Sequence, residues 1–494
     1  MGKAELAIIG GGPGGIATAV EAAKQGVRVT LLDENARVGG QIFRQLEKGF
    51  TPDVPEAMGK NFQKGKELFK EFKLLENKIT YLNSATVWGI FDNNRIAYGR
   101  NGESKTLESE RLLIAAGAYD RPIPFPGWTL PGVLTAGGAQ KLVKIDRIIP
   151  GEKILLAGTG PLQLVLAHQL IRAGANITAV LEAGGFKGKW LKLMQGMWGN
   201  WDYMGDGLRY LRRIHKAGIP LMQGHMITQA RGGGRVEEAV IAKVDKDWRH
   251  IPGTEQTITA DTVCLGYGLV TSTELTRLAE CDHEYDIGLG GYVPVRSKSM
   301  ETTKQGIYAV GDGAGVAGSK VAILEGRIAG IAIASSLGYV SRKKRKSILA
   351  GYNNSLARHT RLRNVLDEIT RPRPGLYELA DDETIICRCE DVTFKDIKDL
   401  VKKKGIKAKD IKRKTRIGMG SCGGRMCGPT IIELLNNMNK AESKPPAGLN
   451  CRPPIKPIPI GVLAGKGDAD KPNNWGTPTA AKHKGGNWHG SKRS

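Results

Sequence analysis

Residues 6–15 read Leu6-Ala7-Ile8-Ile9-Gly10-Gly11-Gly12-Pro13-Gly14-Gly15. The four apolar residues predict a strand buried on both faces of a parallel sheet, and a helical pattern begins at Ile16. The glycines fit G-x-G-x-x-G, in which the first allows a tight turn, the second lets the backbone approach a pyrophosphate and the third permits close helix–strand contact. This stretch therefore predicts a dinucleotide-binding turn, with Gly10, Gly12, Gly14 and Gly15 as candidate contacts.

An acidic pair follows the second predicted strand. Residues 27–32 are mostly apolar and end in Asp33-Glu34. An acid at the end of this strand can accept hydrogen bonds from both hydroxyls of an adenosine ribose. Farther on, Gly39-Gly40-Gln41-Ile42 is a second glycine pair, suited to backbone that passes close to a large cofactor. The pattern predicts that Gly40 and Gln41 lie beside the ligand.

Two later strands end in small or acidic residues. Residues 112–117 end in Ala116-Gly117, and residues 306–312 end in Gly311-Asp312. In this order the segments resemble the glutathione-reductase-like flavoproteins, which have two dinucleotide-binding domains. The resemblance implies an FAD whose adenosine ribose is held by Asp33 and whose ribityl chain or pyrophosphate is held by Asp312. It also implies that helix 321–338 points its N-terminus at the flavin ring, although a plain core helix fits that segment equally well.

A second glycine turn departs from the pattern. Strand 154–157 is followed by Gly158-Thr159-Gly160-Pro161-Leu162-Gln163, so Gln163 stands where the third glycine is expected. The next strand, 177–181, still ends in Glu182. We expect a nested Rossmann-type domain whose candidate contacts are Gly158, Gly160 and Glu182. NAD(P), another adenine nucleotide and no ligand all remain open for this domain, and Gln163 suggests a helix set farther from its strand.

Segment 187–215 interrupts this domain and is rich in Trp, Met and basic residues. An amphipathic surface for a partner subunit or a membrane interface is one interpretation. We favour ordinary core helices over the nucleotide fold. No cysteine precedes Cys264, so the cysteine pair of the disulfide reductases is missing and thiol–disulfide chemistry is not expected.

Four cysteines gather near the C-terminal end with the spacing C-x-C, x32, C-x4-C. They are Cys387, Cys389, Cys422 and Cys427. Four thiolates on two short loops can hold an iron–sulfur cluster or a tetrahedral zinc ion. We favour the cluster because the flavin expected upstream is a group with which a cluster can exchange electrons. Segment 384–438 resembles the [2Fe–2S] domain of bacterioferritin-associated ferredoxin, although that family usually ends in C-x2-C. Cys451 lies off the spacing and is expected to be structural.

Taken together, residues 1–465 resemble the larger flavoprotein subunit of heteromeric amine or amino-acid dehydrogenases, such as hydrogen cyanide synthase, opine oxidase and dye-linked L-proline dehydrogenase. The resemblance rests on the stretches above and on Gln41-Ile42-Phe43-Arg44, residues 311–314 and the run 452–457. It implies that Arg44 contacts the cofactor. It also implies a second flavoprotein subunit of the amino-acid-oxidase type that oxidises an opine, proline or glycine type substrate, an external electron acceptor and, optionally, a small ferredoxin-like subunit.

The predicted fold class is α/β, a two-dinucleotide-binding-domain flavoprotein with a small helical [2Fe–2S] domain. The expected segments are an FAD-binding part (1–150), a nested nucleotide domain (151–270), the FAD-binding return (271–345), a helical basic linker that keeps domains apart (346–383), the [2Fe–2S] domain (384–438) and a Pro-rich segment with a disordered tail (439–494).

The chain has 494 residues and a formal net charge of +24. No nucleic-acid-binding motif accompanies this charge, so nucleic acid is not an expected partner. No apolar run is long enough to span a membrane, and we expect a cytoplasmic protein, with peripheral contact at the inner face of the membrane left open. No histidine lies in a recognisable catalytic constellation. Two alternatives therefore remain: a stand-alone NAD(P)H-dependent flavin and iron–sulfur reductase, and a nucleotide-binding scaffold without a redox role.

Overall fold

A computed structural model describes residues 3–45, 60–185, 190–403, 405–438 and 448–464. The first unit is built on a five-stranded sheet with the order β20-β7-β1-β2-β3. All neighbouring strands in it are parallel. Its strands are β1 (Ala4–Ile9), β2 (Val29–Leu32), β3 (Ile79–Leu82), β7 (Ser109–Ile114) and β20 (Ile307–Ala309). The edge strand β20 therefore comes from a part of the chain far beyond the other four.

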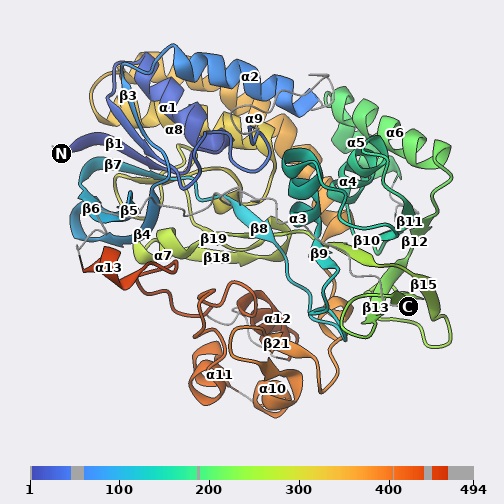
Figure 1. Ribbon diagram of the computed structural model, residues 1–494. Coiled ribbons are helices and arrows are strands. Elements are labelled where there is room, and N and C mark those ends of the chain that lie inside the picture. The colour runs from blue at the N-terminus through green and yellow to red at the C-terminus, as the bar shows by residue number, and fades with distance from the viewer. Residues whose placement is uncertain (1–2, 46–59, 186–189, 404, 439–447, 465–494) are drawn as a thin grey trace, which may run out of the picture.

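Helices cover one face of this sheet (Figure 1). Helix α1 (Pro13–Lys24) packs along α8 (Ser319–Ser336), and α9 (Arg342–Thr370) lies on α8. Helix α2 (Lys60–Lys73) flanks α1. The opposite face packs against an antiparallel sheet of β4 (Thr86–Phe91), β5 (Arg95–Arg100) and β6 (Glu103–Leu107). The basic run after Ser341 opens the 29-residue helix α9, with the Ser341 hydroxyl capping its first turn.

The second unit has its own parallel sheet, with the order β12-β11-β10-β16-β9. Its strands are β9 (Val133–Thr135), β10 (Ile154–Gly158), β11 (Ile177–Glu182), β12 (Leu221–Gln223) and β16 (Thr262–Gly266). This sheet therefore takes its edge strand β9 from before residue 151. The helices of this unit are α3 (Ala136–Lys141), α4 (Pro161–Arg172), α5 (Trp190–Met197) and α6 (Trp201–Lys216), of which α5 packs mainly on α9. An antiparallel sheet of β13 (His225–Arg231), β14 (Glu238–Lys243) and β15 (Gln256–Thr259) completes the unit.

Two paired strands connect the first unit to the second. Strand β8 (Ala118–Asp120) leaves the first unit and runs antiparallel to β17 (Leu269–Thr271), which returns to it. After β17 come α7 (Glu274–Leu278) and the hairpin of β18 (His283–Asp286) and β19 (Gly291–Pro294).

The cysteine-containing unit lies below both (Figure 1) and consists of β21 (Ile385–Cys387), β22 (Val392–Thr393), α10 (Phe394–Val401), α11 (Ala408–Thr415) and α12 (Gly428–Met438). Its core is continuous with that of the second unit, from Phe125 and Trp128 through Leu376 to Ile386. The Trp128 indole also donates to the Ile385 carbonyl at 2.7 Å. The expectation that the linker keeps these units apart is wrong, because apolar residues inside the linker join them.

Segment 448–464 runs back across the first unit. The Ile455 amide donates to the Trp88 carbonyl at 3.0 Å, and α13 (Ile460–Leu463) contacts β6. The disorder predicted for the tail concerns residues 465–494, which lie outside the described residues. Among the helices of the described ranges, none has the length and apolar character that crossing a membrane requires.

Candidate functional site: a dinucleotide cavity and a cysteine pair

The first glycine turn connects β1 to α1 and leaves room for a ligand. Helix α1 begins at Pro13, three residues before the predicted start, because proline is pre-set for the first helical position. A Cβ added at Gly12 would meet only the Cα atom of Gly40, at 3.9 Å. The backbone here is open to a pyrophosphate, as the sequence predicts. Gly15 instead packs directly against the Gly10 carbonyl, which is the helix–strand contact expected of the third glycine.

Asp33 lies at the end of β2 with its carboxylate oriented by its own chain. One oxygen accepts from the Gly11 amide, and the other accepts from the Asn35 amide at 2.6 Å and the Asn35 side chain at 2.8 Å. Burial raises the pKa of Asp33, and these hydrogen bonds oppose the rise. The oxygen that faces Gly11 keeps acceptor capacity for a hydroxyl, so the residue suits the ribose contact predicted for it.

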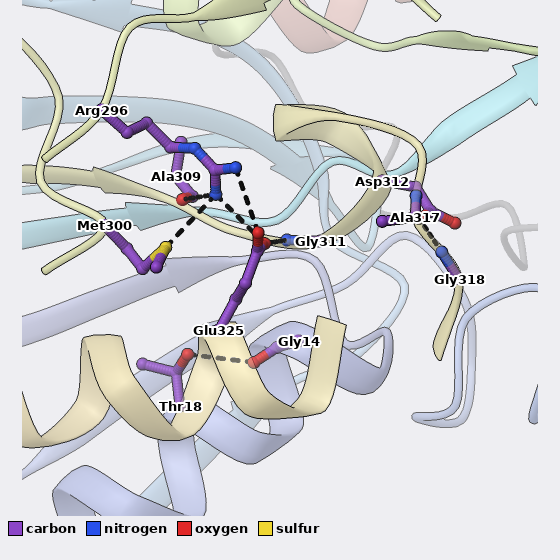
Figure 2. Close-up of polar contacts among 10 residues, drawn as sticks. All are labelled: Gly14, Thr18, Arg296, Met300, Ala309, Gly311, Asp312, Ala317, Gly318 and Glu325. Atoms are coloured by element: carbon purple, nitrogen blue, oxygen red, sulfur yellow. Dashed lines mark hydrogen bonds and ion pairs between the residues drawn. The ribbon is translucent and has the colours of Figure 1, made fainter. Parts of the chain in front are cut away.

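Asp312 lies in the loop between β20 and α8, where Gly311–Ala314 form a short 3-10 turn (Figure 2). Its Oδ1 accepts from the amides of Ala317 and Gly318, both at 3.0 Å. Within the described chain this uses only one of its two oxygens. The adjacent Gly311 amide donates to Glu325 at 2.8 Å, and Arg296 clamps that carboxylate through two nitrogens at 3.0 and 3.1 Å. The loop is therefore fixed from below while one Asp312 oxygen stays available to a ligand.

One large cavity brings the predicted residues together. Its volume is about 2790 Å³, and it extends from the first glycine turn into the second unit. The predicted residues that line it are Gly10, Gly12, Gly14, Asp33, Glu34, Gly40, Gln41, Arg44, Ala116, Gly117, Gly160, Glu182, Gly311 and Asp312. Of the predicted dinucleotide contacts, Gly15 and Gly158 do not line it.

Two further cavity residues are lysines to which the sequence assigns no role: Lys456 belongs to the run 452–457 that carries the family resemblance, and Lys144 lies in no motif. Lys456, from the C-terminal segment, forms an ion pair with Glu34. Lys144 donates to the Ile42 carbonyl at 2.6 Å, and burial, with a smaller effect of Arg44, lowers the pKa of Lys144 to about 8. Both contacts join segments more than a hundred residues apart, so no local signal could have found them.

The second glycine turn differs from the first because the chain itself covers it. A Cβ at Gly160 would lie 2.9 Å from the methyl group of Thr370, at the end of α9. Glu182 accepts from the Thr159 hydroxyl at 2.7 Å, the Gly160 amide at 2.9 Å and the Gly184 amide at 3.0 Å. Burial raises the pKa of Glu182 to about 7, against the effect of these hydrogen bonds.

Gln163 is accommodated by two missing side chains. A Cβ at Gly158 would lie 2.2 Å from the Gln163 Nε2 atom, and one at Gly266 would lie 2.5 Å from it. The two glycines are partners on neighbouring strands β10 and β16. The Gln163 side chain is 1% exposed, and neither its oxygen nor its nitrogen has a hydrogen-bond partner among the described residues. The glutamine side chain therefore fills the space over these two glycines at the strand ends.

The four cysteines lie in the same small unit but do not all meet. Cys387 contacts Cys427, whereas Cys389 is exposed, with its sulfur 3.9 Å from the Ser421 hydroxyl. The Cys427 thiol, together with backbone amides of residues 418, 389 and 390, lowers the pKa of Cys387 to about 5, against the effect of burial. The pKa of Cys427 is raised by its contact with Cys387 and by burial. Within the described ranges no three His, Cys, Asp or Glu side chains converge on a site for one metal ion.

Arg425 connects this unit to the cavity. It lies between Cys422 and Cys427 and lines the cavity wall. Its Nε atom is 2.8 Å from a Glu274 oxygen, and its Nη1 atom donates to the Ile455 carbonyl at 3.1 Å. The loop that carries two of the cysteines is thus tied to α7 and to the C-terminal segment.

The comparisons with known proteins agree with this arrangement. Residues 4–336 match the family described as pyridine nucleotide-disulphide oxidoreductase, and residues 385–437 match the BFD-like [2Fe-2S] binding domain. The chain belongs to the pyridine nucleotide-disulphide oxidoreductase family and is a flavin oxidoreductase with an added [2Fe–2S] domain. The fold class and the resemblance predicted from the sequence are confirmed.

Individual known proteins are similar to this chain over most of its length. The chain is 34% identical to the A-type subunit of opine oxidase from Agrobacterium tumefaciens over 472 residues, covering 93% of this chain and 91% of the relative. It is 32% identical to hydrogen cyanide synthase subunit HcnB of Pseudomonas protegens, covering 92% of this chain and 96% of that one. L-proline dehydrogenase from P. horikoshii shares the fold, with a TM-score of 0.67 and 21% identity over 94% of this chain and 80% of that structure.

The residues fit the two cofactors that these families bind. The open Gly12 backbone, the oriented Asp33 carboxylate and the free Asp312 oxygen suit FAD. Backbone amides donate hydrogen bonds to the Cys387 sulfur. Hydrogen bonds of this kind tune the reduction potential of an iron–sulfur cluster. Cys387, Cys389, Cys422 and Cys427 would hold the cluster.

Proposed function

We propose that this chain is the electron-transferring subunit of a heteromeric dehydrogenase for an amine or amino acid of the opine, proline or glycine type. A second flavoprotein subunit would oxidise the CH–NH group of the substrate, and this chain would pass the electrons to an external acceptor. When bound, FAD supplies two-electron chemistry and a [2Fe–2S] cluster supplies one-electron chemistry. The names of the two relatives, each of them one subunit of an enzyme, support the assembly.

The observation that carries the proposal is the shared wall of the cavity. Gly117 and Asp312 of the first dinucleotide site line the same cavity as Arg425 of the cysteine loop. The Arg425–Glu274 ion pair is largely shielded, with side chains 22% and 17% exposed, so it fixes the loop against the first unit. The continuous core around Trp128 holds the rest of the cysteine unit in place. This chain therefore supplies a rigid connection between its two redox sites.

The contrast between the glycine turns argues against a stand-alone NAD(P)H-dependent reductase. Gly12 faces open space, whereas Gly160 faces Thr370. A pyridine nucleotide at the second turn would have to displace the end of α9. We infer that electrons enter from a partner and not from NADH or NADPH.

Anaerobic mixing tests this directly. Purified chain with bound flavin is mixed with excess NADH or NADPH, and the flavin absorption band is followed. We expect no rapid bleaching, while reduction should occur when the amine substrate is added together with the second flavoprotein subunit. Rapid bleaching by a pyridine nucleotide, or full amine oxidation by the isolated chain, contradicts the proposal. A colourless pure chain would favour a scaffold role.

A further inference from the structure

The outer helices of the second unit expose an apolar surface that the fold itself does not cover. We call it the α5–α6 patch, and it consists of Met194, Trp198, Trp201, Tyr203, Leu208 and Leu211. Trp198 is 69% exposed, Met194 66% and Trp201 55%. Figure 1 shows α5 and α6 at the margin of the molecule. Trp198 and Trp201 pack on each other, with ring centroids 5.6 Å apart, and clusters of exposed apolar side chains mark interaction sites. Helix α6 packs on α4, as the preference for helices over the nucleotide fold predicts, but Ile214 is its only buried residue and much of its surface is exposed.

The patch is what remains after the two helices have packed internally. On α6, Tyr210 stacks on His168 of α4, with ring centroids 4.9 Å apart. After α5, the Asn200 side chain donates to the Arg358 carbonyl of α9 at 3.3 Å. Trp201 and Leu208 are seven residues apart and share a different side of α6. Both helices are thus anchored from behind, and Tyr203, at the inner edge of the patch, packs on His359 of α9 and on Lys320. The other apolar side chains of the patch, Met194, Trp198, Trp201, Leu208 and Leu211, remain exposed.

The patch borders the flavin site. All six of its residues line the same cavity as Gly12 and Asp312. Asp202 forms an ion pair with Lys320, whose Nζ atom also lies 4.1 Å from the ring centroid of Tyr203. Lys320 is the second residue of α8, directly after the loop that Asp312 holds. A molecule seated on the patch would therefore lie at the mouth of the dinucleotide cavity.

We propose that the α5–α6 patch is the docking surface for the second flavoprotein subunit, an inference that rests on the proposed function. Its Trp, Tyr and Met side chains are the types enriched in protein interfaces. The two relatives compared above are each one subunit of an enzyme, which favours a protein over a lipid surface as the occupant. Exposed Arg212, Arg213 and Lys216 beside the patch fit a partner with an acidic rim.

The test uses the full chain, tagged and purified from cells that make the native complex. The double variant Trp198→Glu with Leu208→Glu places two charges in the patch. Ile251→Glu with Leu74→Glu is the matched control, because these residues are 42% and 82% exposed and lie elsewhere. We expect the patch variant to bind the second flavoprotein subunit about 30-fold or more weakly, as for lost interface hot spots, with flavin and iron content unchanged. The control should assemble normally.

Hydrogen exchange of the complex gives an independent reading. Peptides from 194–214 should exchange more slowly when the second subunit is bound. If the patch variant keeps the second subunit and these peptides are not protected, the docking surface is wrong while the proposed function stands. If the wild-type chain has no second flavoprotein subunit, the proposed function itself fails. Patch-dependent binding to phosphatidylglycerol vesicles, or a patch-dependent dimer of this chain, in place of that subunit would also overturn the inference.

Discussion

Replacing Glu325 by Gln removes the negative charge beneath the loop that carries Asp312 (Figure 2). Glu325 is 6% exposed. Its carboxylate accepts from Arg296 at 3.0 and 3.1 Å and from the Gly311 amide at 2.8 Å. A glutamine keeps one acceptor oxygen, and its NH2 group must face a donor. The Gly311 bond loses its charged acceptor, and Arg296, which stays positively charged, loses its carboxylate partner.

The magnitude follows from these contacts. A hydrogen bond to a charged group contributes about 1.5–3 kcal/mol and a neutral one about 0.5–1.5 kcal/mol. A loss of about 1 kcal/mol for each of three bonds gives about 3 kcal/mol, which agrees with the roughly 3–5 kcal/mol for breaking a buried ion pair. Because the Gly311 amide loses its anchor, Asp312 should also be less well placed and FAD should bind more weakly.

Urea unfolding of the first unit, followed by flavin release and circular dichroism, measures the loss. The matched control is Glu378→Gln, because Glu378 also accepts from two nitrogens of one arginine, Arg249, at 2.8 and 2.9 Å, but at the surface. Exposed pairs contribute little, so the control should unfold almost as the wild type does. Equal effects of the two substitutions would refute the reasoning from burial.

Three further outcomes are expected. Asp33→Ala should weaken FAD binding by about one to two orders of magnitude, since a charge-assisted bond is lost; titration of the apoprotein measures this, and an unchanged dissociation constant would move the ribose contact elsewhere. Cys387→Ser should remove iron and sulfide but not flavin, with Cys451→Ser as the control, and zinc without sulfide in anaerobically made protein would contradict the cluster. Glu182, with a pKa of about 7 in the folded protein against an ordinary value of 4.5, holds a proton that the unfolded chain releases, so stability should fall as pH rises from about 5 to 7. Thermal unfolding across that range should show a smaller fall for Glu182→Gln. The remaining fall comes from Glu433 and Asp367, because burial raises their pKa values to about 7 and about 6.

The sequence predicts those parts of the site that local patterns encode. Glycines at fixed spacing after an apolar run, an acid at the end of a strand and cysteine pairs each constrain only a short stretch of chain. The structure accordingly places Asp33 and Asp312 on one cavity. Even so, the helical pattern predicts the start of α1 three residues too late, because it gives weight to Ile16 and not to Pro13 as a helix-starting residue.

Contacts between distant segments cannot be predicted in this way. Thr370 covers Gly160 from about 210 residues away, and Lys456 pairs with Glu34 over 422 residues. Such pairs depend on how whole units pack, which neither periodicity nor composition encodes. The same holds for the linker, whose charge suggests separated domains while Leu376 packs into a core shared by two of them.

The interleaving of the chain bears on the order in which a ribosome could complete the flavin site. Domains generally fold as units while synthesis proceeds from the N-terminus. Here the first sheet is complete only after β20, at residues 307–309, has been synthesised and has paired with β7. Until then β7 is an unpaired edge that can join a wrong strand. Lys456, which pairs with Glu34 at the cavity, is synthesised some 150 residues later still. The nucleotide fold that begins the chain is therefore among the last parts of the protein to be finished.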